Sequence, residues 1–125
     1  MFKPEGHSSV SPYLIVTDAR AVLDFAAKVF DAPVIFTHEG EDGAIVHAEF
    51  RIDDSVVMVG QAPEAQPAHV HVYLADPDTA FDRALAAGGT EVQPMKDQPD
   101  GDRRGGVTDP GGTTWWLSRM LRPRG

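Results

Sequence analysis

The sequence predicts an α+β fold made of two βαβββ modules, and three observations support this prediction. Short runs rich in β-branched residues stand beside two segments whose apolar residues recur at helical spacing. The order of these segments in residues 11–62 is repeated in residues 69–121. Asp18 and Asp76, 58 positions apart, each end an apolar run and precede a helical segment. Because internal repetition of this kind defines an architecture, we expect one domain over residues 1–125.

The first module is predicted to begin with a strand at 13–18 and to continue with a helix at 19–30. Asp18 is expected to cap this helix, because a carboxylate at that position accepts a free backbone N–H. Three short strands follow, rich in β-branched residues and separated by turns that contain glycine and aspartate. These strands are expected at 34–38, 44–52 and 55–60.

The second module is predicted to repeat this order from a strand at 69–76. Its helix is expected to start at Pro77 and to stop at Gly88, which are typical start and stop signals. Three further strands are expected at 90–95, 105–109 and 114–120. The Asp-Pro-Gly-Gly segment 109–112 is typical of a turn, since proline presets one dihedral angle and glycine allows a positive φ.

Each helix can cover only one face of its sheet, and an apolar sheet face cannot stay bare in water. The two modules are therefore expected to form a curved, half-open barrel of mixed sheet, with the helices outside and a hollow inside. Such a hollow is the default place for a small-molecule ligand. The edge strands further predict a homodimer, because sheet edges are normally paired or covered. Whether the modules pair within one chain or by exchange between two chains stays open.

Alternation of side chains along each strand assigns residues to the two faces of the sheets. The residues expected to face the hollow are Ser11, Tyr13, Ile15, His47, Glu49, Arg51, His69, His71 and Tyr73. The residues expected on the helix side are Leu14, Val16, Val46, Ala48, Phe50, Ile52, Val70, Val72 and Leu74. The predicted hollow is therefore largely polar and aromatic, and the predicted core is apolar.

The adjacent residues Trp115 and Trp116 must point to opposite faces of the last strand. Trp115, in step with Leu117, is expected to pack under a helix. Trp116, in step with Thr114 and Ser118, is expected to face the hollow or a dimer partner. There its ring either stacks on a planar ligand or fills the hollow, and the sequence does not decide between the two.

Composition excludes several classes of function. The chain has no cysteine, which excludes disulfides, thiolate metal sites and thiol nucleophiles. Its formal net charge of −8 argues against nucleic acid, because phosphate binding needs a basic face. The first residues lack the apolar stretch of a signal peptide, and no run reaches the ~20 apolar residues of a membrane span. We therefore expect a cytoplasmic protein that binds neither nucleic acid nor membrane.

Four segments carry a family resemblance: SPYLIVTDARAVLDFAAKVF at 11–30, VHAEFRIDDSVVMVG at 46–60, HVHVYLADPDTAFDRALAAGG at 69–89 and GDRRGGVTDPGGTTWWL at 101–117. Together they resemble the vicinal oxygen chelate superfamily, the glyoxalase/bleomycin resistance protein/extradiol dioxygenase group. The last segment is similar to the GDRxG…DPxG segment of a bacterial glyoxalase-like subgroup. The resemblance implies the paired-module fold, a small-molecule ligand and a dimer.

The resemblance also implies a divalent metal, held by His, Gln or Glu side chains that project inward from the first and last strands of the modules. Carried over by position, these ligands fall on Ser11, His69 and Trp116. Only His69 is a good metal ligand, whereas a catalytic site usually needs about three. We therefore expect no metal cofactor. The alternative is Zn, Ni, Fe or Mn bound around His69, or a relocated set that His47 and Glu49 join.

The leading hypothesis is a small-molecule binding protein that sequesters an aromatic or apolar compound, in the manner of drug-binding resistance proteins. The alternative is a metal-dependent lyase, isomerase or dioxygenase with a non-standard ligand set around His69, and a third interpretation is a purely structural module. The predicted ligand-binding residues are Tyr13, His47, Glu49, His69, His71, Tyr73, Trp116 and Arg103. No residue is assigned a catalytic role.

Two of these assignments compete with simpler interpretations. Arg103 could steer an anionic ligand, but a surface ion pair with acidic neighbours at positions 97–102 is favoured. His47 and Glu49 project the same way from one strand, so the carboxylate could tune the imidazole for acid–base chemistry. The favoured interpretation is two polar residues on a wet face.

Overall fold

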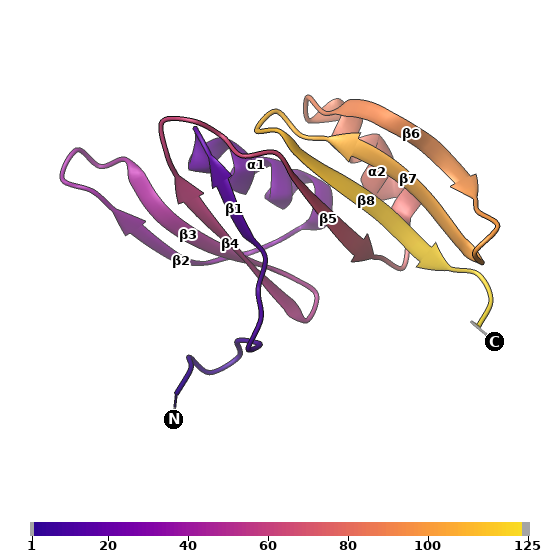
Figure 1. Ribbon diagram of the computed structural model, residues 1–125, viewed down its shortest axis with the longest axis horizontal. Helices are drawn as coiled ribbons and strands as arrows, with labels where there is room; N and C mark the ends of the chain where they lie inside the picture. The colour runs from indigo at the N-terminus through magenta and orange to yellow at the C-terminus, as the bar shows by residue number, and fades with distance from the viewer. Residues whose placement is uncertain (1, 124–125) are drawn as a thin grey trace. The chain divides into compact units, whose positions relative to one another are not determined.

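The computed structural model describes residues 2–123, which form two compact units that divide between Gln66 and Pro67. Each unit has the order strand, helix, strand, strand, strand (Figure 1). The predicted α+β fold of two βαβββ modules is therefore confirmed. The barrel that the modules would form together stays a prediction.

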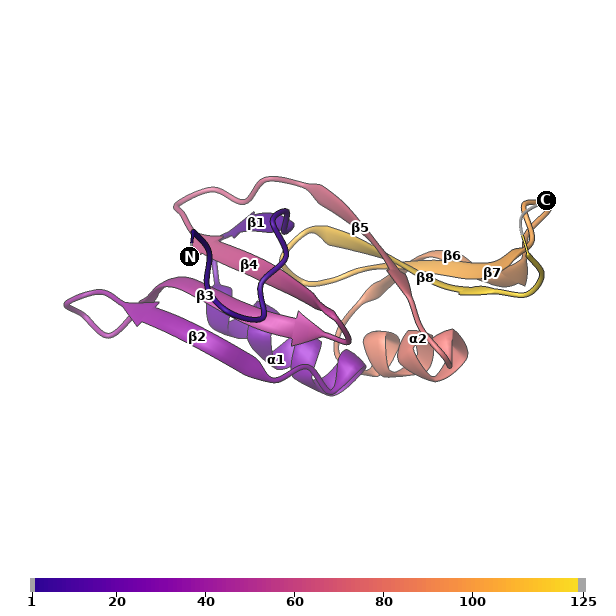
Figure 2. The ribbon, with the colours of Figure 1, turned by 90° about the horizontal axis from the view of Figure 1, so that it is seen from below.

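Unit 1 is a four-stranded sheet, called sheet 1, with a helix on one face (Figure 2). Its elements are β1 (Tyr13–Val16), α1 (Ala19–Phe30), β2 (Val34–Glu39), β3 (Ile45–Ile52) and β4 (Ser55–Gln61). The strand order is β1-β4-β3-β2, with β1 parallel to β4 and the other neighbours antiparallel. The two central strands, β3 and β4, are the ones that α1 contacts most.

The core of unit 1 follows from the amphipathic pattern of α1. Asp18 caps the helix, since its carboxylate accepts the Ala21 N–H at 3.2 Å. Asp31 ends the helix in the left-handed region at a φ of 52°. The helix residues buried against the sheet are Ala19, Val22, Leu23, Phe25, Ala26 and Val29. On the sheet side, the core contains predicted apolar side chains of β1 and β3, of which Leu14, Val16, Ala48, Phe50 and Ile52 are buried.

Unit 2 repeats this design in sheet 2, which has the order β5-β8-β7-β6. Its elements are β5 (Ala68–Tyr73), α2 (Pro77–Ala86), β6 (Thr90–Asp97), β7 (Asp102–Thr108) and β8 (Thr113–Met120). Asp76 caps α2 by accepting the Thr79 N–H at 3.1 Å. The helix ends before Gly88, which takes a φ of 96°. A side chain at Gly89 would collide with Val107, so the close approach of helix and sheet requires glycine there.

Two expectations about the core are wrong. Val46 was expected on the helix side, but 47% of its surface is exposed, and Ile45 is buried instead. The register shifts at this point, because His38 pairs with His47 whereas Glu39 pairs with Ile45, which leaves Val46 as the extra residue of a β-bulge. A bulge interrupts the alternation on which the expectation depended.

The second correction concerns β5. Val70 and Leu74 were expected under the helix, but they are only half-buried, and Val72 is the buried residue of the three. β5 is an edge strand of sheet 2, and α2 packs mainly on β7, β8 and β6. An edge strand outside the footprint of the helix keeps its apolar side chains partly open.

Candidate functional site

Sheet 1 carries a cluster of polar and aromatic side chains on the face opposite α1. Tyr13 on β1 and His47 and Glu49 on β3 alternate with the buried residues of those strands, as predicted. We call this surface helix-free face 1. Glu49 is its most enclosed charged residue, with only 8% of its surface exposed.

The Glu49 carboxylate is held by two imidazoles. Nε2 of His7 lies 2.7 Å from Oε1, and Nε2 of His47 lies 2.8 Å from Oε2. Burial raises the pKa of the Glu49 carboxyl, but the hydrogen bonds from His47 and His7 outweigh it and hold the pKa below its ordinary value of 4.5. An ionised carboxylate only accepts hydrogen bonds, so the proton of each neutral imidazole must be on Nε2.

Two aromatic rings contact His47, one of the two imidazoles that hold this carboxylate. The ring of Tyr13 stacks on that of His47, with centroids 5.6 Å apart and planes 25° apart. The ring of Phe36 on β2 also lies near that of His47, with centroids 6.1 Å apart and the two planes tilted by 56°. Tyr13 and Phe36 each keep about half of their surface exposed, at 54% and 51%. The face therefore offers exposed ring surface beside a buried negative charge.

The sequence did not identify His7 as a functional residue. It belongs to the N-terminal segment, residues 2–12, which precedes β1 and lies outside the helices and strands. The segment is fixed to β3 at a second point, where Arg51 donates to the Gly6 carbonyl at 3.1 Å. Because His7 and Glu49 are 42 positions apart and follow no periodic pattern, no signal in the sequence could have paired them.

Sheet 2 carries a second aromatic cluster on the face opposite α2, which we call helix-free face 2. The Trp116 indole N–H donates to Nδ1 of His69 at 3.1 Å, and the two rings are nearly parallel, 11° apart with centroids at 6.1 Å. Gly106 on β7 makes room for the indole, because a Cβ there would lie 2.6 Å from a ring carbon. Trp115 points to the other side and is fully buried.

His71 and Tyr73 extend helix-free face 2 along β5. Their rings meet edge to face, with centroids 4.6 Å apart, and the Tyr73 hydroxyl donates to Asp102 at 2.8 Å. His71 lies opposite Trp116 in the parallel β5–β8 pair. The structure thus brings His69, His71, Tyr73 and Trp116 together as the alternation predicted.

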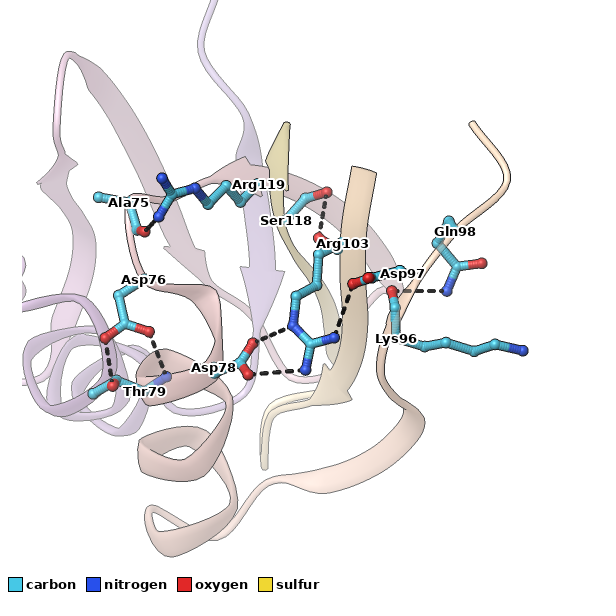
Figure 3. Close-up of polar contacts among 10 residues, drawn as sticks. All are labelled: Ala75, Asp76, Asp78, Thr79, Lys96, Asp97, Gln98, Arg103, Ser118 and Arg119. Atoms are coloured by element: carbon cyan, nitrogen blue, oxygen red, sulfur yellow. Dashed lines mark hydrogen bonds and ion pairs between the residues drawn. The ribbon is translucent and has the colours of Figure 1, made fainter. Parts of the chain in front are cut away.

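Arg103 does not belong to helix-free face 2. Its guanidinium donates to both carboxylate oxygens of Asp78 at 2.8 and 2.9 Å and to Asp97 at 3.0 Å (Figure 3). The hydrogen bonds that Arg103 donates to Asp78 and Asp97 raise its pKa above the ordinary range. The ion-pair interpretation of Arg103 therefore fits the structure, with Asp78 at the start of α2 as a partner that the sequence did not reveal.

A shallow hollow of about 510 Å³ lies beside this ion pair. Its lining consists of Ala75, Asp76, Pro77, Asp78, Arg103, Arg119, Met120 and Leu121. Arg119 donates to the Ala75 carbonyl at 2.7 Å, and Asp76 is used by Thr79 (Figure 3). Its charged side chains thus already bond to groups of the protein, so nothing here calls for a ligand.

Comparison with known proteins gives the family. The model of the glyoxalase/bleomycin resistance protein/dioxygenase superfamily matches residues 7–117. The chain belongs to this superfamily. The uncharacterized protein Rv0887c of Mycobacterium tuberculosis is 37% identical to it over 128 residues, which cover 91% of this chain and 75% of that protein. The resemblance inferred from the sequence is confirmed.

Solved structures of the glyoxalase/bleomycin resistance/dioxygenase superfamily share the fold. TioX from Micromonospora sp. ML1 is 30% identical, with a TM-score of 0.79 over 91% of this chain and 99% of that chain. The fosfomycin resistance protein FosX from Mesorhizobium loti is 20% identical, with a TM-score of 0.67 over 94% of this chain and 93% of that chain. At that identity the likeness to FosX shows the fold alone.

The metal that the superfamily implies does not fit the side chains at the carried-over positions. The indole nitrogen of Trp116 is a donor only and offers no lone pair to a cation. Nδ1 of His69 already accepts that indole N–H. Within residues 2–123, no group of three or more His, Asp or Glu side chains is arranged to hold a metal ion.

None of the helices that the structure describes in residues 2–123 is long and apolar enough to cross a bilayer.

Proposed function

We propose that this superfamily member sequesters a planar aromatic or apolar small molecule without a metal at the superfamily's ligand positions. The observation that carries the proposal is the Trp116–His69 pair. Its two rings lie parallel on helix-free face 2, where metal binding would require a carboxylate and a free imidazole nitrogen. A flat pair of rings instead provides a surface on which a third flat ring can stack.

The energy of such stacking corresponds to weak binding, with a Kd on the order of 1 mM, because its two contributions sum to about 3–4 kcal/mol. Aromatic pairs contribute about 0.5–1.5 kcal/mol beyond the area they bury. A ligand that removes on the order of 100 Å² of apolar surface from water gains roughly 2.5 kcal/mol more. Both helix-free faces carry exposed rings, Tyr13 and Phe36 on one and Tyr73 on the other. Each face alone could therefore bind a small planar compound.

Calorimetric titration with a panel of planar compounds tests the proposal. The panel contains bleomycin, because of the superfamily's name, and the neutral ketone 2-acetonaphthone. Trp116→Ala is expected to weaken binding of 2-acetonaphthone about tenfold, the equivalent of one lost stacking contact. Leu85→Ala, which shortens an exposed side chain on α2 of the same unit, is the matched control and should leave the affinity unchanged.

Two results would contradict the proposal. The first is stoichiometric, tightly bound Zn, Ni, Fe or Mn in the purified protein, which would favour the metal-dependent lyase, isomerase or dioxygenase alternative. The second is a panel without any stabilised complex, since a ligand at 100 times its Kd should add about 2.7 kcal/mol to the free energy of unfolding.

We also propose that the protein is a cytoplasmic homodimer. The edge strands β2 and β6 expose apolar side chains, among them Val34, Ile35 and Val92. Sheet edges of this kind are normally covered by a partner. Light scattering on the purified protein should give twice the mass of the chain, and a monomer at micromolar concentration would contradict the proposal.

A further inference from the structure

Glu49 is paired in an unusual way for a charge within a sheet. A buried carboxylate needs partners for both oxygens, because an unpaired buried charge is costly. His47, on the same strand, serves only Oε2. Oε1 depends on His7, which lies on the N-terminal segment and not on sheet 1. The second partner of this charge therefore comes from outside the sheet.

The hydrogen bonding of the His7 imidazole is incomplete. Its Nε2 donates to Glu49, but its Nδ1 is buried and has no hydrogen-bond partner among residues 2–123. A buried acceptor without a donor destabilises the contact in which it is held. Most of the other residues of the N-terminal segment are exposed, so they contribute little burial that would hold His7 in place. The His7 imidazole therefore satisfies Glu49 with one ring nitrogen and leaves its other ring nitrogen unsatisfied.

The surroundings of Glu49 suit a cation that also has an aromatic part. Tyr13, stacked on His47, presents an exposed ring on the same face, and cations are attracted to ring faces. Arg51 also lies on this face of β3, and its guanidinium donates to the Gly6 carbonyl. The net charge of −8 attracts cationic ligands over longer distances.

We propose that Glu49 is an anionic subsite for a basic group of the ligand, and that His7 occupies this position until the ligand displaces it. This inference rests on the proposed function as applied to helix-free face 1, and it specifies the ligand of that face as a planar compound with an amidinium or ammonium group. On binding, the basic group donates to Oε1 in place of His7, and the aromatic part lies against Tyr13 and His47.

Three naphthalene compounds of nearly equal shape test the charge preference. They are 2-naphthamidine, a cation; 2-acetonaphthone, which is neutral and has no N–H donor; and 2-naphthoate, an anion. Calorimetry on the whole protein should rank the cation at least about tenfold tighter than the neutral ketone, with the anion weakest. The imidazole NMR signals of His7 should shift on addition of the cation, because its contact with Glu49 is broken.

Two variants separate the roles of the carboxylate and the imidazole. Glu49→Gln should reduce the preference for the cation over the ketone to near unity. His7→Ala should tighten binding of the cation about tenfold, because it removes an internal competitor. Asp24→Asn is the matched control, since it removes one negative charge from the exposed side of α1, on the opposite face of sheet 1, and it should change neither affinity. His7→Ala changes a residue outside the helices and strands and leaves the Glu49 carboxylate in place, so it remains informative if Glu49→Gln fails to fold.

The outcomes distinguish this inference from the function on which it rests. If the ketone binds but the cation shows no preference, or the preference survives Glu49→Gln, the subsite is refuted while ligand binding stands. If His7→Ala weakens binding of the cation, His7 is a contact of the ligand and not its stand-in. If none of the three compounds binds, the proposed function is refuted as well.

Discussion

Replacing Asp109 by alanine removes a carboxylate that three N–H groups share. Oδ1 accepts the backbone N–H of Gly111 at 2.8 Å and of Thr113 at 3.1 Å, and Oδ2 accepts the indole N–H of Trp115 at 2.9 Å. Asp109, Thr113 and Trp115 are buried, so water cannot replace these bonds without opening the unit. At about 1–3 kcal/mol for each buried donor left unpaired, we expect Asp109→Ala to lower the free energy of unfolding by about 3–5 kcal/mol.

Urea denaturation, followed by tryptophan fluorescence and circular dichroism, measures this loss. Asp109→Asn keeps an oxygen for the turn but can place its NH₂ group against the Trp115 indole, so its cost should be about half as large. A cycle with Trp115→Phe should show a coupling of about 1–2 kcal/mol between the two side chains. Asp82→Ala, an exposed acidic residue on α2, is the control and should cost less than about 0.5 kcal/mol. A cost below about 1 kcal/mol for Asp109→Ala would refute the reasoning.

Three further predictions follow from contacts described above. Gly106→Ala should push the Trp116 indole aside, because the new Cβ would lie 2.6 Å from a carbon of its ring. We expect the free energy of unfolding to fall by about 1–3 kcal/mol and the tryptophan emission to shift to the red. Unchanged emission would contradict this prediction. The pKa of Glu49 is lowered in the folded protein, so its ionised form stabilises the fold above pH 4.5 and this contribution is lost as the pH falls through the folded pKa. The stability difference between the wild type and Glu49→Gln should therefore shrink from about pH 7 to about pH 3 in urea titrations, and a constant difference would refute it. Arg103→Gln should change the urea midpoint little and leave ligand affinity unchanged, because its partner Asp78 is half-exposed and surface ion pairs contribute little. A calorimetric change in affinity would return Arg103 to the site.

The sequence predicted those features that depend on local periodicity. Asp18 and Asp76 mark both helix starts because a cap is a short-range interaction between a side chain and the next turn. Trp115 and Trp116 could be assigned to opposite faces because neighbouring residues of a strand always alternate. Both assignments follow from backbone geometry and need no knowledge of distant residues.

Features that depend on distant contacts could not be predicted. The bulge at Val46 arises from the way β2 and β3 pair, and no pattern in the eight residues of β3 indicates it. The bond between His7 and Glu49 joins a segment without periodicity to a strand 42 positions away. Arg103 had several acidic neighbours in sequence, but the bidentate partner, Asp78, lies 25 positions away. In each case the fold selected one partner among many that the sequence allowed.

The near-parallel arrangement of the Trp116 and His69 rings has a consequence for which ligands this surface can accept. A coordinated ion constrains what approaches it, because its bonds have fixed lengths and angles. An indole plane sets only one requirement, a flat counterpart, and tolerates sliding and rotation within that plane. Chemically dissimilar flat molecules could therefore share this platform, and discrimination among them would fall to whatever polar group stands at its border.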